Sequence, residues 1–86
     1  MPRERNALIT EISHFVRTEL LQKPDAELDP GEPLITGGLL DSFSLARIAV
    51  FVEETLGVYL PDSELTVDNM DSVGQIADKV IEWSDK

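Results

Sequence analysis

With 86 residues, of which 42% are hydrophobic, the chain is expected to form one folded domain, 1–86. It contains no cysteine, which excludes disulfides, thiolate metal sites and any thiol chemistry of its own, and its formal net charge of -10 at pH 7 disfavours nucleic acid as a partner and favours basic protein surfaces. The N-terminal residues lack the apolar run of a signal peptide and no apolar segment reaches the roughly 18 residues of a membrane span, so we expect a cytoplasmic protein.

The first predicted element is a helix from about Arg5 to Leu21. Its apolar residues recur at the spacing of one helix face: Leu8, Ile12, Phe15, Val16 and Leu20. His14 is the only histidine of the chain, and it falls on this helix. We expect it to be a solvated or half-packed residue rather than a catalytic base.

A long connection from Gln22 to Leu40 follows. It holds Pro24, Pro30, Pro33 and the pair Gly37-Gly38, all of which favour turns. The same segment carries several apolar side chains: Leu28, Leu34, Ile35, Leu39 and Leu40. Because long loops in small domains are commonly functional, we expect these side chains to hold the loop over the bundle.

The second helix is predicted from Ser42 to about Leu56, with Asp41 as its N-cap and Gly57 at its end. Its core stripe is formed by Leu45, Ile48, Ala49, Val52 and Leu56. A second face carries Phe43, Arg47, Val50, Phe51 and Glu54. Because three of these five residues are apolar, we expect this face to bind partner proteins. The alternative is that Val50 or Phe51 is buried against the long loop.

Beyond Gly57, Pro61 and the acids that follow it predict one short helix of one or two turns. The last helix is predicted to begin at Ser72, which forms a capping box with Gln75, and Trp83 closes it. Its buried face is expected to be Val73, Ile76, Ala77, Val80 and Ile81. The resulting fold class is all-α, a small four-helix bundle of three longer helices and one short helix, with a long loop between the first two.

Four acids in the second half of the chain raise the question of a calcium site: Asp62, Glu64, Asp68 and Asp71. Their spacing does not match a calcium-binding helix-loop-helix, and no glycine lies among them. We therefore predict no metal site, and we expect these acids to be helix-start residues and solvated surface.

The candidate site is Ser42, at the end of the glycine-bearing loop and in the first turn of the second helix. Unpartnered amide groups and the helix dipole make such a position favourable for a phosphate group attached to the hydroxyl. Seen alone, an Asp-Ser pair at a helix start is usually only a cap. A hydrolase nucleophile is disfavoured, because the sequence places no histidine together with an acid for Ser42, and the Gly-x-Ser-x-Gly pattern is absent around it.

The chain resembles the acyl carrier protein family in four segments, in order and at matching spacing: Leu28–Leu34, Gly38–Phe43 with the triplet Asp41-Ser42-Phe43, Glu53–Pro61 and Leu65–Val73. The resemblance runs from the first helix to about Ile81. It implies that a phosphopantetheinyl transferase, with coenzyme A and Mg²⁺, attaches 4′-phosphopantetheine to Ser42, and that Asp41 caps the helix and helps the transferase to recognise it. The arm supplies the missing thiol, so the chain would carry a thioester without being an enzyme.

The resemblance also implies partners: an adenylating ligase or acyltransferase that loads the arm, and downstream acyl-processing enzymes, acting on a monomer. Carriers of fatty acid synthesis usually have acids where this chain has Ser44 and Arg47. An arginine there is similar to peptidyl carriers, whose motif has glycine and histidine before the serine instead of Asp41. The mixture resembles discrete carriers that an adenylating ligase loads, such as those of D-alanyl or polyketide and nonribosomal pathways, and a fatty acid-like pathway stays open as well. The alternative is a carrier-like module that is never modified and acts only by binding a protein.

Overall fold

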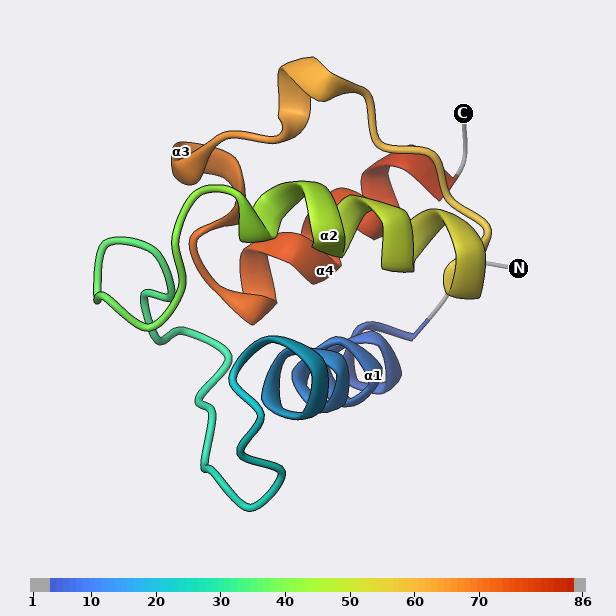
Figure 1. Cartoon of the computed structure of the whole chain (residues 1–86). Coiled ribbons are helices and arrows are strands. Elements are labelled where there is room, and N and C mark those ends of the chain that lie inside the picture. The colour runs from blue at the N-terminus through green and yellow to red at the C-terminus, as the bar shows by residue number, and fades with distance from the viewer. Residues whose placement is uncertain (1–3, 85–86) are drawn as a thin grey trace.

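The computed structural model describes residues 4–84, which form a small bundle of helices without a strand (Figure 1). The elements in chain order are α1 (Arg5–Phe15), continued by the π-helical turn η1 (Val16–Leu20); α2 (Ser44–Phe51), continued by the π-helical turn η2 (Val52–Leu56); the 3₁₀ turn η3 (Asp62–Glu64); α3 (Val67–Met70); and α4 (Val73–Ser84). None of the helices in this described range combines the length and the hydrophobicity needed to cross a bilayer.

One hydrophobic core holds these elements together, and α1 packs against α4 within it. It contains most of the apolar stripes expected of the three longer helices: Leu8, Ile12 and Val16; Leu45, Ile48, Val52 and Leu56; Val73, Ile76, Ala77 and Val80. Ala49 and Ile81 are only partly buried. Since burial of one such aliphatic side chain contributes about 1.5–3 kcal/mol, these stripes supply most of the driving force for folding.

The bounds of the longer helices differ little from those predicted, except at the start of α2. The first helix ends at Leu20, and the second ends at Gly57, whose φ of 73° gives it the left-handed conformation that glycine adopts freely. The α-helix of α2, however, begins at Ser44 and not at Ser42. The amides of Ser44 and Leu45 donate to carbonyls three residues earlier, at 3.1 and 3.2 Å, so Ser42 lies in a tighter turn that precedes the helix.

Two short helical segments lie between α2 and α4, where one was predicted. Pro61 is extended and lies just before η3, which is a single turn. Thr66 then starts α3, and its Oγ1 accepts a hydrogen bond from the Asn69 amide at 3.3 Å. Because Thr66 satisfies a first-turn amide, the chain can re-enter a helix directly after η3.

The start of α4 is capped by the residues predicted, although their pairing is shifted. The Ser72 hydroxyl accepts a hydrogen bond from the Gln75 amide at 3.2 Å, as a capping box requires. The Gln75 side chain accepts from the amide of Asp71 at 2.8 Å instead of from that of Ser72. The cap therefore includes the residue before Ser72.

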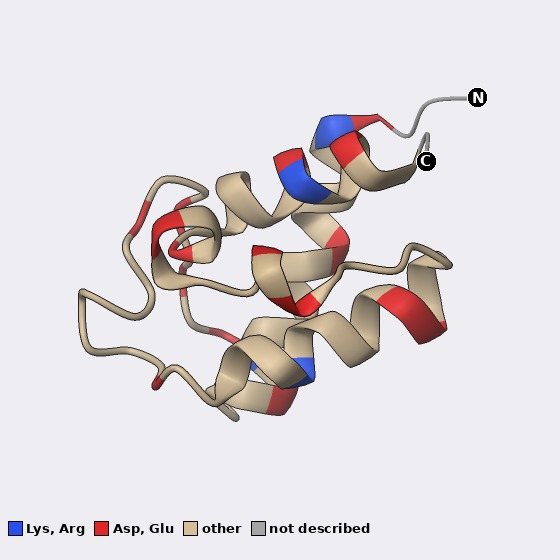
Figure 2. Cartoon of the chain, turned by 90° about the horizontal axis from the view of Figure 1, so that it is seen from above, with Lys and Arg blue, Asp and Glu red and all other residues tan. Residues whose placement is uncertain are grey.

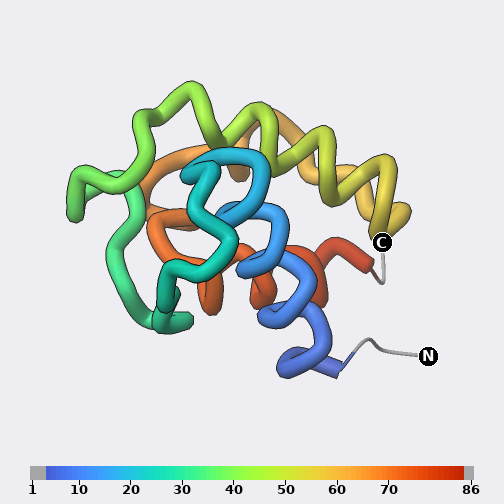
Figure 3. Tube along the Cα trace, turned by 60° about the horizontal axis from the view of Figure 1, so that its bottom comes forward, coloured from blue at the N-terminus to red at the C-terminus, as the bar shows by residue number. Residues whose placement is uncertain are grey.

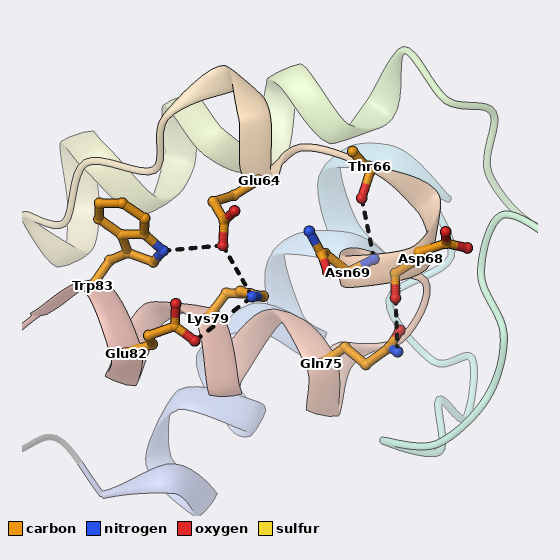
Figure 4. A network of polar contacts seen from close by, with 8 residues as sticks. All are labelled: Glu64, Thr66, Asp68, Asn69, Gln75, Lys79, Glu82 and Trp83. Carbon is orange, nitrogen blue, oxygen red and sulfur yellow. Dashed lines mark hydrogen bonds and ion pairs between the residues drawn. The ribbon is translucent and has the colours of Figure 1, made fainter.

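Glu64 was expected to be solvated, but its side chain instead connects η3 to α4 (Figure 4). Its Oε1 accepts hydrogen bonds from Lys79 Nζ at 2.9 Å and from Trp83 Nε1 at 3.2 Å. Glu64 is the main cause of the raised pKa of Lys79, which also faces Glu82 at 3.6 Å. Within residues 4–84, no group of three acidic or histidine side chains is arranged to hold a metal ion.

Acidic residues are spread over the helices and the long loop, whereas lysine and arginine occur at few places (Figure 2). Arg5 of α1 pairs with Asp78 of α4 at 2.8 Å, and Lys79 pairs with Glu64. Arg47 is the only basic residue of α2, and it is exposed. The negative charge, which is predicted to steer the protein towards basic surfaces, is therefore distributed over the described part of the chain and not gathered on one element.

Candidate functional site

The long loop is held against the first turn of α4 by backbone hydrogen bonds. The Gly74 amide donates to the Pro30 carbonyl at 2.8 Å, and the Leu34 amide donates to the Asp71 carbonyl. Figure 3 shows the loop passing beside the start of α4 on its way to α2. These contacts attach the loop to a rigid element well before it reaches Ser42.

Two of the expected apolar anchors of the loop lie fully in the core. Leu34 is 0% exposed and Leu40 is 9% exposed, and Leu28 and Ile35 are partly buried. Leu39, in contrast, is 40% exposed. The expectation that apolar side chains hold the loop over the bundle is therefore correct for all of them except Leu39.

Asp71 is a part of the site that the sequence analysis missed, because it was expected to be solvated. Its Oδ1 accepts from the amides of Ile35 at 2.7 Å and Thr36 at 3.0 Å, and its Oδ2 accepts from the Thr36 hydroxyl at 2.6 Å. These bonds, the Thr36 hydroxyl first, lower the pKa of Asp71 against the opposing effect of desolvation. The partners lie 35 and 36 residues away, so no local pattern could have indicated them.

The lowered pKa of Asp71 predicts a loss of stability in acid. In the unfolded chain the pKa of this carboxyl is near 3.8, and in the folded chain it is lower. The carboxylate therefore stabilises the fold above pH 3.8, and this contribution is lost as the pH falls from there through the folded-state pKa. Urea unfolding at several pH values should show the wild type to be more stable than Asp71→Asn near neutrality, with the gap closing in acid. A gap that is independent of pH contradicts this prediction.

Ser42 lies exposed in the turn that leads into α2, between the exposed Asp41 and Phe43. Asp41 Oδ1 accepts from the Ser44 amide at 3.2 Å and from the Ser44 hydroxyl at 3.4 Å, which is the capping role expected of it. Within residues 4–84, the Ser42 hydroxyl and the amides of Ser42 and Phe43 make no hydrogen bond. The turn therefore presents a hydroxyl together with two amide donors that can stabilise a phosphate.

The turn before this serine depends on two glycines for different reasons. Gly38 has a φ of 83°, a conformation that residues with a side chain adopt only with strain. At Gly37, a Cβ would lie well inside van der Waals contact with the Pro33 carbonyl oxygen. A larger residue at Gly37 would therefore require the backbone to move, and a residue with a side chain at Gly38 would be strained by the positive φ.

Replacement of Gly37 with alanine is expected to lower the free energy of unfolding by about 1–3 kcal/mol, because the backbone must move to relieve the clash. Gly31→Ala is the matched control in the same loop. A Cβ at Gly31 meets only Asp29 Oδ1 at 3.6 Å, an ordinary contact. Urea denaturation followed by circular dichroism measures both variants, and equal effects would show that the close approach at Gly37 is unimportant.

The expected partner-binding face of α2 is only partly free. Phe43 is 83% exposed and Val50 is 54% exposed, while Arg47 and Glu54 are also exposed. Phe51 is half-buried, and its ring stacks on Phe15 with centroids 4.3 Å apart. The alternative of burial under the long loop is therefore wrong for Val50, and Phe51 packs on α1 instead of on the loop.

A hollow of about 450 Å³ lies along this face and brings together four of the five residues predicted to bind partners. Its lining is Arg47, Val50, Phe51, Glu54 and Thr55 from the second helix, and Phe15 and Glu19 from the first. Phe43 lies outside it, next to Ser42 in the turn. The hollow is wide open and lined by both charged and apolar side chains, as a surface depression for a protein partner would be.

His14 is exposed, and it lines a second hollow of about 380 Å³ with Arg17, Phe51 and Thr55. Phe51 and Thr55 belong to the end of the second helix that is far from Ser42. His14, the only histidine of the chain, is therefore solvated, as expected, and lines a hollow at the end of the second helix away from the candidate serine.

No protein-family model and no curated protein matches this chain. The chemistry of the site must therefore be inferred from the residues themselves. They form an exposed, unbonded serine hydroxyl at a helix start, a capping aspartate beside it, an anchored loop before it and a partly apolar helix face after it. Such an arrangement can accept a group from another protein, while the Asp41 carboxylate is bonded to the amide and the hydroxyl of Ser44.

Proposed function

We propose that this chain is a cytoplasmic, monomeric carrier protein of the acyl carrier type, in which Ser42 bears 4′-phosphopantetheine. The thiol of that arm holds an acyl or aminoacyl group as a thioester and moves it between partner enzymes. The observation that supports this function most is the position of Ser42 in the turn that leads into α2, where its residue is exposed and its hydroxyl makes no hydrogen bond within residues 4–84. The resemblance of four sequence segments to acyl carrier proteins supports the same function.

The modification would proceed at the Ser42 oxygen. That oxygen forms a bond to the phosphorus next to the pantetheine of coenzyme A, the phosphoanhydride bond breaks, and adenosine 3′,5′-bisphosphate leaves. The proton of the hydroxyl passes to a base of the transferase or to water, and Mg²⁺ neutralises the diphosphate. The amides of Ser42 and Phe43, which make no hydrogen bond within residues 4–84, would be available to stabilise the negative charge of the phosphodiester.

The chain itself would catalyse no step of this cycle. A phosphopantetheinyl transferase attaches the arm, an adenylating ligase or an acyltransferase loads it, and acyl-processing enzymes remove the cargo. With a net charge of -10, the chain would approach transferases and ligases that present basic surfaces, and salt would slow that approach.

The docking surface would be the exposed face of α2 that begins at Phe43. Phe43 and Val50 supply apolar area next to the attachment point, and Arg47 replaces the acid expected in carriers of fatty acid synthesis. Phe51 would act indirectly, since its stacking on Phe15 shapes the hollow between the first two helices. This mixed surface supports a discrete carrier of the D-alanyl or polyketide and nonribosomal type more than a carrier of fatty acid synthesis.

The deciding experiment is the intact mass of the folded protein after incubation with coenzyme A, Mg²⁺ and a broad-specificity phosphopantetheinyl transferase. We expect a gain of one phosphopantetheine, located on Ser42 by peptide mass spectrometry. If several transferases leave the mass of the folded protein unchanged, the carrier function is wrong. The exposed Phe43 would then favour the alternative, an unmodified module that acts only by binding a protein.

A further inference from the structure

A chain of hydrogen bonds connects the junction between α3 and α4 to the end of the loop that precedes Ser42. It begins at Asp71, whose carboxylate accepts three hydrogen bonds from Ile35 and Thr36. Hydrogen bonds to an ionised acceptor are stronger than neutral ones, and two of these three are 2.7 Å or shorter. The Asp71 carboxylate therefore makes three charge-assisted hydrogen bonds to the loop.

Leu34 carries the connection from Asp71 towards the serine. Its amide donates to the Asp71 carbonyl, and its own carbonyl accepts from the amides of Leu39 and Leu40, both at 2.9 Å. Its side chain is fully buried. Leu34 thus closes the turn of residues 34–40, while Asp71 holds that turn at the junction between α3 and α4.

The connection ends two residues before Ser42. Leu40 is buried, and Asp41 and Ser42 follow it directly, so the place where the chain leaves the core sets where the hydroxyl can lie. Ser42 itself makes no hydrogen bond to α4 within residues 4–84. Its position therefore depends on the turn of residues 34–40 before it and on α2 after it, where the Leu45 amide donates to the Ser42 carbonyl at 3.2 Å.

We propose that Asp71 is a positioning residue for the modification of Ser42, because it holds the turn of residues 34–40 in the one arrangement that presents the serine to a transferase. This inference rests on the proposed carrier function. Asp71 does not touch the reacting atoms. It raises the fraction of molecules that are ready to bind the transferase, and so acts on apparent affinity and not on the chemical step.

The kinetic test compares Asp71→Ala, Asp71→Asn and the control Asp68→Ala as substrates of one transferase with coenzyme A. Asp68 is an exposed acid beside the same part of the loop, and its carboxylate accepts no hydrogen bond within residues 4–84. We expect Asp71→Ala to raise the KM for the protein by about tenfold with kcat nearly unchanged, since only the competent fraction falls. Asp71→Asn should lie between, because its amide oxygen still accepts from Ile35 and Thr36, and Asp68→Ala should match the wild type.

A second measurement separates positioning from a general loss of stability. Amide hydrogen exchange in the unmodified protein should become faster at Leu39 and Leu40 in Asp71→Ala, while amides of core helix residues such as Ile12 keep their protection. Thr36→Ala, which removes only the hydroxyl partner, should show the same pattern in weaker form. An equal increase at Ile12 and at Leu39 would overturn the inference, because it would show that Asp71 stabilises the whole fold.

The two proposals fail in different ways. If the wild type is modified and Asp71→Ala keeps the wild-type KM, Asp71 does not position Ser42, but the carrier function stands. If the wild type gains no phosphopantetheine, the carrier function fails and the role of Asp71 in modification falls with it.

Discussion

Replacement of Ser42 with alanine is expected to abolish the gain of phosphopantetheine completely while the helical fold remains. The side chain is exposed, and its hydroxyl makes no hydrogen bond within residues 4–84, so its removal costs the fold little. Substitutions at such surface positions usually change stability by no more than about 0.5 kcal/mol. Intact mass spectrometry measures the loss of modification, and circular dichroism checks the fold.

Ser44→Ala is the matched control, because Ser44 lies only two residues further on and also carries a hydroxyl. That hydroxyl makes only a long contact of 3.4 Å to Asp41 Oδ1, and its residue is half-buried at the start of α2. The Ser44→Ala protein should therefore gain the arm at close to the wild-type rate. A Ser42→Ala protein that still gains one phosphopantetheine would assign the attachment to another hydroxyl and refute the assignment to Ser42.

Replacement of Leu34 with alanine is expected to lower the free energy of unfolding by about 2–5 kcal/mol, as for other fully buried leucines. Leu34 is 0% exposed although it belongs to a loop. Domains typically have only about 5–15 kcal/mol of stability in total, so this loss is severe. The backbone bonds of Leu34 to Asp71, Leu39 and Leu40 do not involve its side chain, which makes the substitution a test of packing alone.

Leu39→Ala is the control for this prediction. Leu39 lies in the same loop but is 40% exposed, so its truncation should cost less than about 1 kcal/mol. Urea denaturation of both variants at pH 7 measures the difference. Similar losses at Leu34 and Leu39 would mean that the loop is not packed into the core in the way the structure indicates.

The two predictions describe complementary parts of one site. In the proposed function Ser42 is the reacting group, and its exposed side chain contributes little to the fold, whereas Leu34 is part of the core. The segment between them is held in place, because the Leu34 carbonyl accepts hydrogen bonds from the amides of Leu39 and Leu40, and the Leu40 side chain is buried. The Leu34→Ala protein should therefore also be a poorer substrate of the transferase than the wild type, even when only folded molecules are compared.

Much of the fold and part of the site could be predicted from sequence because the interactions involved are local. The apolar spacing of residues 5–20 and 73–84 defines one face of each helix, and that face is buried whatever it packs against. Gly57 ends its helix through its own backbone, and Ser72 and Asp41 cap amides only three residues away. Each of these interactions involves residues close in the chain, so the printed sequence contains both partners side by side.

The start of α2, the state of Phe51 and the role of Asp71 were decided by the tertiary structure. Ser42 lies in a tighter turn before the helix, since the chain must leave the core at Leu40 and turn at once into α2. Phe51 is half-buried only because α1 brings Phe15 against it. In the sequence, Asp71 cannot be distinguished from the other surface acids. Its role depends on the loop, which places Ile35 and Thr36 against it although they lie 36 and 35 residues away in the chain. Local spacing determines which face of a helix is apolar, but which distant group meets a carboxylate or a ring depends on how the elements pack.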